Sequence, residues 1–247
     1  MTLFLTFAYG LIFGSFLNVL IYRLPRGENI AYPPSHCTSC NTKLKPRDLI
    51  PVFSFLFLGG KCRYCGEKIH WCYPVTEIVN ALGWMTIIYY YGLSARGVAG
   101  CFLFSLALVI GQIDLEHYLI PDSLVITLLA GGVVYHFFSQ EMGILNRILG
   151  LAVGFAIPFL LAVVSRGGMG GGDIKLTAAM GFWLGFPGVF YALFVGALVG
   201  SITGILLIAL KRKKRRDPIP FGPFLVLGFL VIFFFRDQFV QWYWNLF

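Results

Sequence analysis

Long apolar runs recur along this chain and restrict it to one class of fold. Charged residues make up 12% of the sequence, about half the share found in soluble domains. Most of the runs reach the length that a helix needs to cross a bilayer. The sequence therefore predicts an all-α, polytopic membrane protein with about eight transmembrane helices. The predicted spans are 3–22, 75–92, 98–113, 123–139, 146–165, 174–186, 188–210 and 220–236.

The basic residues gather between these runs and predict which side of the membrane each segment occupies. Sixteen of the nineteen Lys and Arg residues fall in 23–73, at Arg166, at Lys175 and in 211–216. Loops rich in Lys and Arg remain in the cytosol, so the net charge of +8 indicates topology. Nucleic-acid binding is not expected of a chain this apolar. The cytosolic segments are predicted to be 23–73, 114–122, 166–173 and 211–219.

Four cysteines in the only long polar segment, 23–73, form two C-x-x-C units. Paired units of this kind, about 20 residues apart, are typical of a four-thiolate zinc site. Two disulfides or free thiols are the alternative, and a reducing cytosolic loop makes disulfides less favourable. His36 and His70 are weaker alternative ligands. We therefore predict a small zinc-ribbon-like loop domain, with structural zinc held by Cys37, Cys40, Cys62 and Cys65.

The first apolar run presents small residues, Gly10, Gly14 and Ser15, that suit close helix contact. Asn18 follows them near the cytosolic end of the same run. The simplest interpretation of Asn18 is a hydrogen bond to a neighbouring helix. Glu77 lies just inside the second predicted span, where an acid indicates a partner such as an Arg or Lys of the segment 23–73.

The glycine-rich stretch Gly167–Lys175, GGMGGGDIK, leads to an acid at the border of an apolar run. An ionisable residue at a hydrocarbon boundary is costly and indicates a function. Asp114 lies at the cytosolic end of another predicted span, fifty-nine positions before Asp173. Two carboxylates a few ångströms apart share a proton, so one can activate water while the other protonates a peptide carbonyl. The pair predicts hydrolysis of the aspartic-protease type at the membrane edge.

Each of these residues also has a structural interpretation. Asp173 suits a helix N-cap, Asp114 suits an interfacial helix end, and Asp122 is predicted to cap the helix over 123–139. Lys175 is expected either to tune Asp173 or to bind a carboxylate. Because glycine lets another backbone approach closely, substrate contact is expected at Gly168, Gly170, Gly171 and Gly172, together with Lys175.

Three segments together resemble the type IV prepilin peptidases, a family of GxGD-type intramembrane aspartic proteases. They are GSFLNVLIYRLP at Gly14–Pro25, the two C-x-x-C units, and the pair DLEHYLIPD and GMGGGDIKL that begin at Asp114 and Gly168. The resemblance implies that Asp114 and Asp173 form the catalytic dyad and that the four cysteines hold zinc. It also implies three domains: a first transmembrane helix at 1–22, a zinc-binding, methyltransferase-associated loop at 23–73, and a seven-helix peptidase domain at 74–247.

The activity implied by this resemblance has two steps, both in the bacterial inner membrane. The short basic leader of a prepilin or pseudopilin is removed after a glycine at the cytosolic face. Many members then methylate the new N-terminal residue with S-adenosylmethionine, and the retained long loop favours this two-activity form. No motif locates the methyl-donor site. The candidates near it are Asn18, Arg23 and Glu77.

Two other classes of function fit part of the pattern. A proton- or cation-coupled transporter would also use buried acids, but such acids are expected nearer the bilayer midplane. A non-catalytic secretion scaffold would use the zinc loop alone. The sequence does not indicate which pilins are substrates or what the oligomeric state is.

Overall fold

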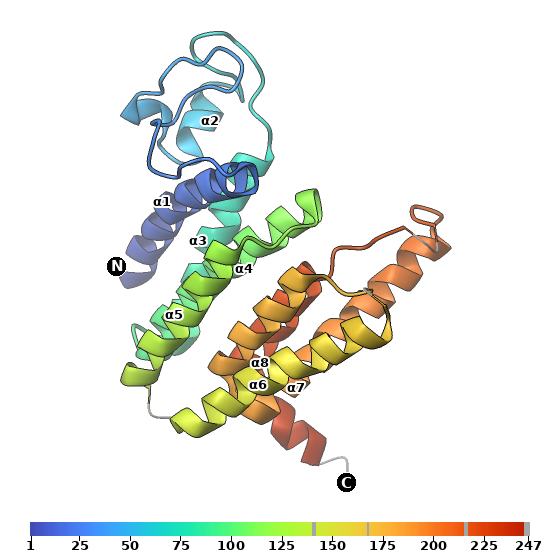
Figure 1. The fold of residues 1–247 in the computed structure, drawn as a ribbon. Coiled ribbons are helices and arrows are strands. Elements are labelled where there is room, and N and C mark those ends of the chain that lie inside the picture. Colours follow the sequence, from blue (N-terminus) through green and yellow to red (C-terminus); the bar gives the residue numbers. More distant parts are fainter. Residues whose placement is uncertain (140–141, 167, 215–216, 245–247) are drawn as a thin grey trace. The chain divides into compact units, whose positions relative to one another are not determined.

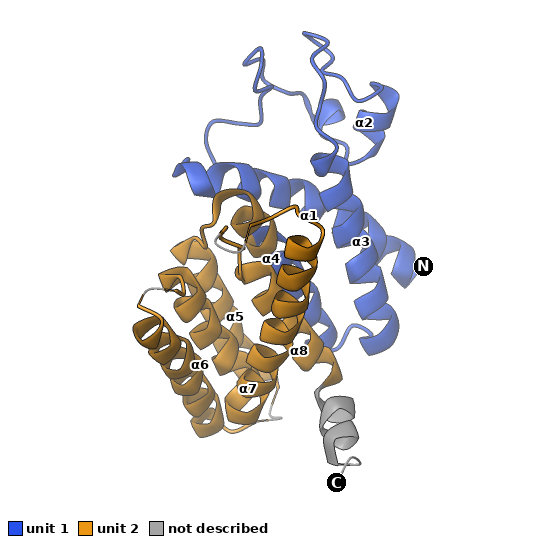
Figure 2. Cartoon of the chain, turned by 90° about the vertical axis from the view of Figure 1, so that its right-hand side faces the viewer, with its two compact units in different colours: residues 1–109 blue, residues 110–247 orange. Residues whose placement is uncertain are grey.

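The computed structural model describes residues 1–139, 142–166, 168–214 and 217–244, with side chains up to Phe235. The named elements in these ranges are all helices, as predicted (Figure 1). The chain divides into two compact units, Met1–Val109 and Ile110–Phe247 (Figure 2). Helix α4 (Ala95–His117) begins in unit 1 and ends in unit 2.

Unit 1 is built on the contact between α1 (Thr2–Arg23) and α3 (Cys72–Tyr91). A Cβ atom on Gly10 would lie 2.6 Å from the Cα of Ala81, and one on Gly14 would lie 2.6 Å from the Cα of Glu77. The two backbones therefore approach at a distance that only glycine permits. This confirms the predicted small-residue face of the first helix.

A buried chain of hydrogen bonds crosses unit 1. Asn80 Nδ2 donates to the Gly10 carbonyl at 2.8 Å, and the Ser105 hydroxyl donates to Asn80 Oδ1 at 2.7 Å. The Trp84 indole donates to the same hydroxyl at 2.9 Å. These bonds join α1, α3 and α4, and they satisfy polar groups that would be costly to leave unpaired in an apolar interior.

The segment between α1 and α3 folds without strands in the part of the chain described, although two isolated antiparallel bridges occur. It contains the 3-10 turns η1 (Leu24–Arg26) and η2 (Pro46–Asp48) and the short helix α2 (Phe53–Phe57). Phe55 is the buried residue of α2, and its ring packs edge-on against Trp71 at a centroid distance of 4.7 Å.

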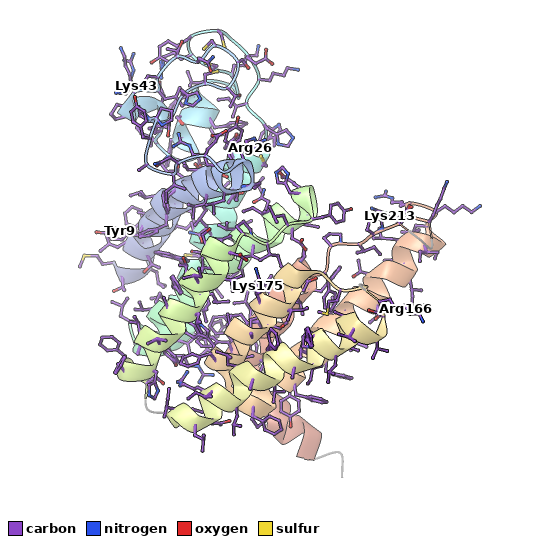
Figure 3. All side chains as sticks on the ribbon, viewed as in Figure 1. Tyr9, Arg26, Lys43, Arg166, Lys175 and Lys213 are labelled. Atoms are coloured by element: carbon purple, nitrogen blue, oxygen red, sulfur yellow. The ribbon has the colours of Figure 1, made fainter. Side chains whose placement is uncertain are left out.

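Unit 2 contains the rest of α4, α5 (Asp122–Phe138), α6 (Ile144–Val164), α7 (Gly171–Ala209) and α8 (Gly222–Trp244). Helix α7 packs against α5, α6 and α8. It is interrupted at Gly185, where φ is 71° and ψ is 179°. Lys175 and Lys213, near the two ends of α7, lie at the same end of unit 2 (Figure 3), so the chain reverses at this break. The predicted helices over 174–186 and 188–210 are these two arms.

Side chains from α6 satisfy backbone groups around the break. Asn146 Oδ1 accepts a hydrogen bond from the Phe186 N–H at 3.0 Å. Arg147 is fully buried and donates toward the carbonyls of Phe182 and Trp183 at 3.4 and 3.5 Å. Its guanidinium also lies 5.6 Å from the centre of the Tyr135 ring. Arg147 therefore stabilises a reversal whose backbone groups would otherwise be unpaired in an apolar layer.

By length and composition, α1, α4, α6 and α7 are apolar enough to cross a membrane, and α5 and α8 include shorter apolar helices. A polytopic helical membrane protein is thus confirmed among the described residues. The count of eight spans stays a prediction, because α7 is one continuous candidate and α3 is not among the four.

Candidate active site and metal centre

The four predicted zinc ligands of unit 1 meet in one cluster. The sulfur atoms of Cys37, Cys40, Cys62 and Cys65 all lie within 4.8 Å of one another. The Sγ atoms of Cys37 and Cys65 are 3.8 Å apart, which is the spacing of two thiolates at tetrahedral positions about 2.3 Å from one zinc ion. The donor set therefore fits structural zinc.

Two similar turns bring the sulfurs together. The Cys37 N–H donates to the Thr42 carbonyl at 3.0 Å, and the Cys62 N–H donates to the Glu67 carbonyl at 2.8 Å. The fifth residue of each turn has a positive φ, 55° at Asn41 and 74° at Gly66. These are residue types that tolerate the left-handed region, so each knuckle is specified by its own short sequence.

The thiols share hydrogen bonds as a group. The Thr42 side chain and backbone lower the pKa of the Cys40 thiol to about 6. At Cys65 a backbone hydrogen bond from Glu67 lowers the pKa of the thiol. Burial and the hydrogen bonds with the neighbouring thiols raise this pKa, and the net result is a pKa of about 12. A bound cation would displace the protons that remain, because zinc binds thiolates.

Neither histidine belongs to the cysteine group among the described residues. His36 Nδ1 lies 3.2 Å from the Pro34 carbonyl, and His70 Nδ1 accepts from the Cys72 N–H at 3.2 Å. Both rings therefore have local hydrogen-bond partners.

Asp114 lies in unit 2, in the last turns of α4, and is 5% exposed. Its Oδ2 accepts a hydrogen bond of 2.8 Å from the N–H of Gly222, the first residue of α8. A helix N-terminus carries unpaired N–H groups and a positive partial charge, both of which favour an anion. The carboxylate of Asp114 is therefore held at a site suited to negative charge, and among the described residues it forms no ion pair.

Asp173 is the third residue of α7, whose N-cap is Gly170. The predicted alternative, that Asp173 is itself the N-cap, is therefore wrong by three positions. Its Oδ2 lies 3.1 Å from the place that a Cβ on Gly170 would occupy, so the side chain turns back over the start of the helix. The charge of Asp114 acts on Asp173, which places the two acids within electrostatic reach of each other in unit 2.

The contact between Ile120 and Gly172 brings these helix ends together. Ile120, in the connection between α4 and α5, is buried, and its Cβ lies 3.1 Å from where a Cβ on Gly172 would be. The absence of a side chain at Gly172 leaves room for Ile120, so packing within unit 2 is one reason for a glycine at this position.

The remaining glycines of the stretch differ from one another. Gly167 lies outside the described residues. A Cβ on Gly168 would meet the Ser165 hydroxyl at 2.8 Å, whereas one on Gly171 would meet nothing within 4 Å. Gly171 and Gly172 are already helical, so extended backbone in this stretch ends at Gly170.

Lys175 pairs with Asp122. Its Nζ lies 2.9 Å from both carboxylate oxygens, and both side chains are more than half exposed. Asp122 is the first residue of α5, with Pro121 as the N-cap. The predicted capping role of Asp122 is therefore wrong, because its carboxylate joins the starts of α5 and α7 instead.

The three residues predicted near a methyl-donor site all line one cavity in unit 1. Asn18 Nδ2 donates to the Tyr73 carbonyl at 3.0 Å, which confirms the expected bond between helices. Arg23 is buried and donates to the carbonyls of Asn29, Ile30 and Pro33. Glu77 is 7% exposed and accepts from the Val52 N–H at 2.7 Å.

Gly222 was not predicted to belong to the site. Its N–H contacts Asp114, and a Cβ there would lie 2.7 Å from the Asp114 Oδ2. The available signal was its place between Phe221 and Pro223, where a segment predicted to be cytosolic ends and an apolar helix begins. A proline is tolerated in the first turn of a helix, so Pro223 is consistent with a helix start, but no sequence pattern indicates which acid this start would meet.

Comparison with known proteins defines the class of this chain. The sequence profile described as Bacterial Peptidase A24 N-terminal domain matches residues 8–91, and the profile described as Type IV leader peptidase family matches residues 101–205. The second match includes both acids. Since a peptidase profile covers them, the chain is an enzyme of a peptidase class, as predicted.

Relatives extend over nearly the whole chain. The prepilin leader peptidase/N-methyltransferase of Bacillus subtilis is 33% identical, over 96% of each chain. Proteins of the same name from Xanthomonas campestris and Pseudomonas aeruginosa are 32% and 30% identical. The matches cover 95% and 96% of this chain and 91% and 92% of theirs. No solved structure matches. The chain therefore belongs to the type IV leader peptidase family.

Proposed function

We propose that this protein is an intramembrane aspartic endopeptidase that removes the leader of type IV prepilins or pseudopilins, with Asp114 and Asp173 as its catalytic dyad. The observation that supports the proposal is that α4 and α7 carry the two acids into the same unit, where Ile120, which follows α4, packs on Gly172 and the charge of Asp114 acts on Asp173. The names of the relatives supply the substrate class.

The two acids have complementary roles in this mechanism. The ionised carboxylate accepts a proton from water as the water oxygen attacks the scissile carbonyl carbon, while the protonated acid donates to the carbonyl oxygen. The tetrahedral species then collapses and the carbon–nitrogen bond breaks. The departing amine takes the proton gained from water, and a hydroxyl of the tetrahedral species returns a proton to the acid that had donated one. Both acids are then in their starting states.

We assign the ionised role to Asp114. It accepts the Gly222 N–H at the start of α8, and such a bond stabilises the charged form. Two carboxylates in contact do not both ionise easily, so the shared proton resides on Asp173. This division makes Gly222 a positioning residue for the water-activating base.

The proposed topology has eight spans in the bacterial inner membrane, with the N-terminus outside the cytosol. The two arms of α7 count separately, because the chain reverses at Gly185. Arg166, Lys175 and Lys213 lie at one end of unit 2 (Figure 3), as expected for a cytosolic end under the positive-inside rule. A basic leader would then remain in the cytosol while the apolar pilin helix enters from the bilayer.

The second proposed activity is methylation of the new N-terminal residue with S-adenosylmethionine, as the names of the relatives indicate. Zinc held by the four cysteines would stabilise the loop that carries this activity, since a closed four-thiolate site has no open position for chemistry. The substrates and the lipid bilayer are the partners we propose. We assign no oligomeric state.

A transporter or a scaffold accounts for less of the molecule. A transporter would not need the cysteine cluster, and a scaffold would not need a buried acid held by a helix N-terminus. Cleavage of a prepilin-like peptide by the purified protein in detergent separates these classes. We expect cleavage by the wild type and a loss of about 10²-fold or more in both Asp114→Asn and Asp173→Asn. Full activity of either variant would remove that residue from the chemistry.

The glycines before α7 offer a separate test of substrate contact. A side chain on Gly170 would press on Asp173, but one on Gly171 would meet nothing of this chain within 4 Å. If the substrate approaches this backbone closely, Gly171→Val should raise KM while the protein still inserts into membranes. Wild-type kinetics for Gly171→Val would show that no substrate contact occurs there.

A further inference from the structure

Unit 1 contains a cavity of about 360 Å³, within the range of about 300–1,000 Å³ typical of small-molecule sites. Its walls come from the cytosolic ends of α1 and α3 and from the zinc loop, all within 15–77. The catalytic acids lie in unit 2. The cavity therefore belongs to a different part of the chain from the proposed peptidase chemistry.

One part of the wall is apolar and aromatic. Tyr22, Phe55 and Tyr73 line the cavity together with aliphatic residues that include Val19, Leu44 and Leu58. Flat aromatic surfaces and branched aliphatic side chains suit a planar heterocyclic base, because stacking buries its faces without requiring its polar edge to be desolvated.

Several of the polar groups in the wall already have partners. Asn18 and Arg23 donate to backbone carbonyls. Asp48 accepts from Arg63 Nε at 2.7 Å and from the Tyr64 hydroxyl at 2.8 Å. These residues shape the loop around the cavity, and their charges and amides are largely used in doing so.

Glu77 differs from the other acids in the wall. It is 7% exposed, and among the described residues it forms no ion pair. Glu67, in contrast, is exposed to solvent. A buried carboxylate is costly unless a cation accompanies it. Its position in a cavity wall leaves room for a cation supplied by a ligand.

The backbone that holds Glu77 is strained. Val52, whose N–H donates to the carboxylate, has φ of 62° and ψ of −49°, and the Phe53 N–H closes a tight turn onto the Pro51 carbonyl at 2.6 Å. A positive φ is rare for a β-branched residue. Strain of this kind costs about 1–3 kcal/mol and clusters at binding sites. Here it fixes the direction of the carboxylate.

We propose that this cavity binds the methyl donor, with its heterocyclic base against the aromatic wall and its sulfonium facing Glu77. The inference rests on the methyl-transfer part of the proposed function. The donor supplies a methyl carbon to the amine of the cleaved substrate; the carbon–sulfur electron pair goes to sulfur, and the amine loses a proton to water. Glu77 is a binding residue in this account, because its charge offsets that of the sulfonium.

The contribution of the sulfonium charge to binding can be measured by comparing two ligands that differ in this charge. S-adenosylmethionine and S-adenosylhomocysteine share the base, the ribose, the ammonium and the carboxylate, but only the first carries the sulfonium. Binding of both to the full chain in detergent is measured by titration calorimetry. In Glu77→Gln we expect about a tenfold loss of affinity for S-adenosylmethionine, equivalent to about 1.4 kcal/mol. The affinity for S-adenosylhomocysteine should change by less than about threefold, because the Coulomb term is removed from one ligand only.

The matched control is Glu28→Gln, which removes the same charge from an exposed position of the same loop outside the cavity wall. It should leave both affinities unchanged. Equal weakening of both ligands in Glu77→Gln, or equal effects of the two variants, would contradict a sulfonium contact. Zinc content and the melting temperature of each variant report whether the loop remains folded.

A measurement on the wild type does not depend on any variant folding. Radiolabelled S-adenosylmethionine is cross-linked with ultraviolet light, and the labelled peptide is identified after digestion. Label within 15–77 supports the cavity. Label confined to unit 2, or no binding by a protein that cleaves prepilin, overturns the inference and leaves the peptidase proposal standing. Failure of cleavage with label still in 15–77 would overturn the peptidase proposal instead.

Discussion

The cysteine cluster of unit 1 and the acid pair of unit 2 are assembled in opposite ways. All four sulfurs come from one loop, and the outermost pair is 28 positions apart. Each knuckle closes through its own backbone hydrogen bonds. The surroundings of Asp114 and Asp173, in contrast, depend on distant segments: the connection after α4 packs on Gly172, and the start of α8 binds Asp114. Damage to the first site should therefore remain local, whereas the second should respond to changes on several helices.

The largest expected effect is on the metal centre. Cys40→Ser removes one of four ligands, and structural zinc contributes on the order of 10 kcal/mol or more to the folding of such a loop. We expect bound zinc to fall from one per chain to nearly none, with new protease cleavage within 23–73. Elemental analysis and limited proteolysis measure both. Cys72→Ser, outside the cluster, should keep its zinc. Equal zinc in the two variants would contradict the assigned ligand set.

Gly222→Ala tests how strongly the acid pair of unit 2 depends on its surroundings, because it adds a single methyl group beside Asp114. The added carbon would lie 2.7 Å from the Asp114 oxygen, so either the acid or the helix start must move. Displacement of about 1 Å at a catalytic group can cost roughly 10²-fold in rate. We expect kcat for prepilin cleavage to fall by about that factor. Gly111→Ala is the control, because its methyl group would approach other atoms no closer than 3.9 Å.

Gly14→Ala examines whether the contact between α1 and α3 supports the cavity of unit 1. Its methyl group would lie 2.6 Å from the Glu77 Cα, which forces α1 and α3 apart. Overpacking of this kind typically costs about 1–3 kcal/mol. We expect a lower melting temperature and weaker binding of the methyl donor, both measured on the same detergent-purified protein. If the variant has the wild-type melting temperature and binds the methyl donor with wild-type affinity, the contact between α1 and α3 accommodates the added methyl group, contrary to this prediction.

The smallest effect is expected at the ion pair of Lys175 and Asp122. Both side chains are largely exposed, and such pairs contribute about 0–1 kcal/mol. Lys175→Gln and Asp122→Asn should each change the free energy of unfolding by less than about 1 kcal/mol. If Lys175 contacts substrate as well, only Lys175→Gln will raise KM. Equal KM values for the two variants would limit Lys175 to the ion pair.

Much of the fold could be predicted from the sequence, because lipid imposes long apolar helices and short basic connections. The cysteine cluster followed from local spacing. Gly10 and Gly14 followed from the small-residue pattern of helix contacts. These features are all encoded within one segment or one helix.

The rest depends on contacts between distant segments. The Gly222 hydrogen bond to Asp114 joins positions 108 apart, and no periodicity links them. The capping role predicted for Asp122 failed because Lys175, from another helix, attracts its carboxylate. The hydrogen bonds from Arg23 to three loop carbonyls likewise depend on how residues 24–33 fold. The charge of Arg23 alone therefore did not indicate its structural role.

The most direct test of the central claim is a double-mutant cycle on prepilin cleavage with Asp114→Asn, Asp173→Asn and the double variant. Residues that act as one unit are strongly non-additive. We predict that the double variant cleaves about as slowly as either single variant. A double variant slower by the product of the two single effects, or a single variant with wild-type turnover, would contradict a shared catalytic dyad.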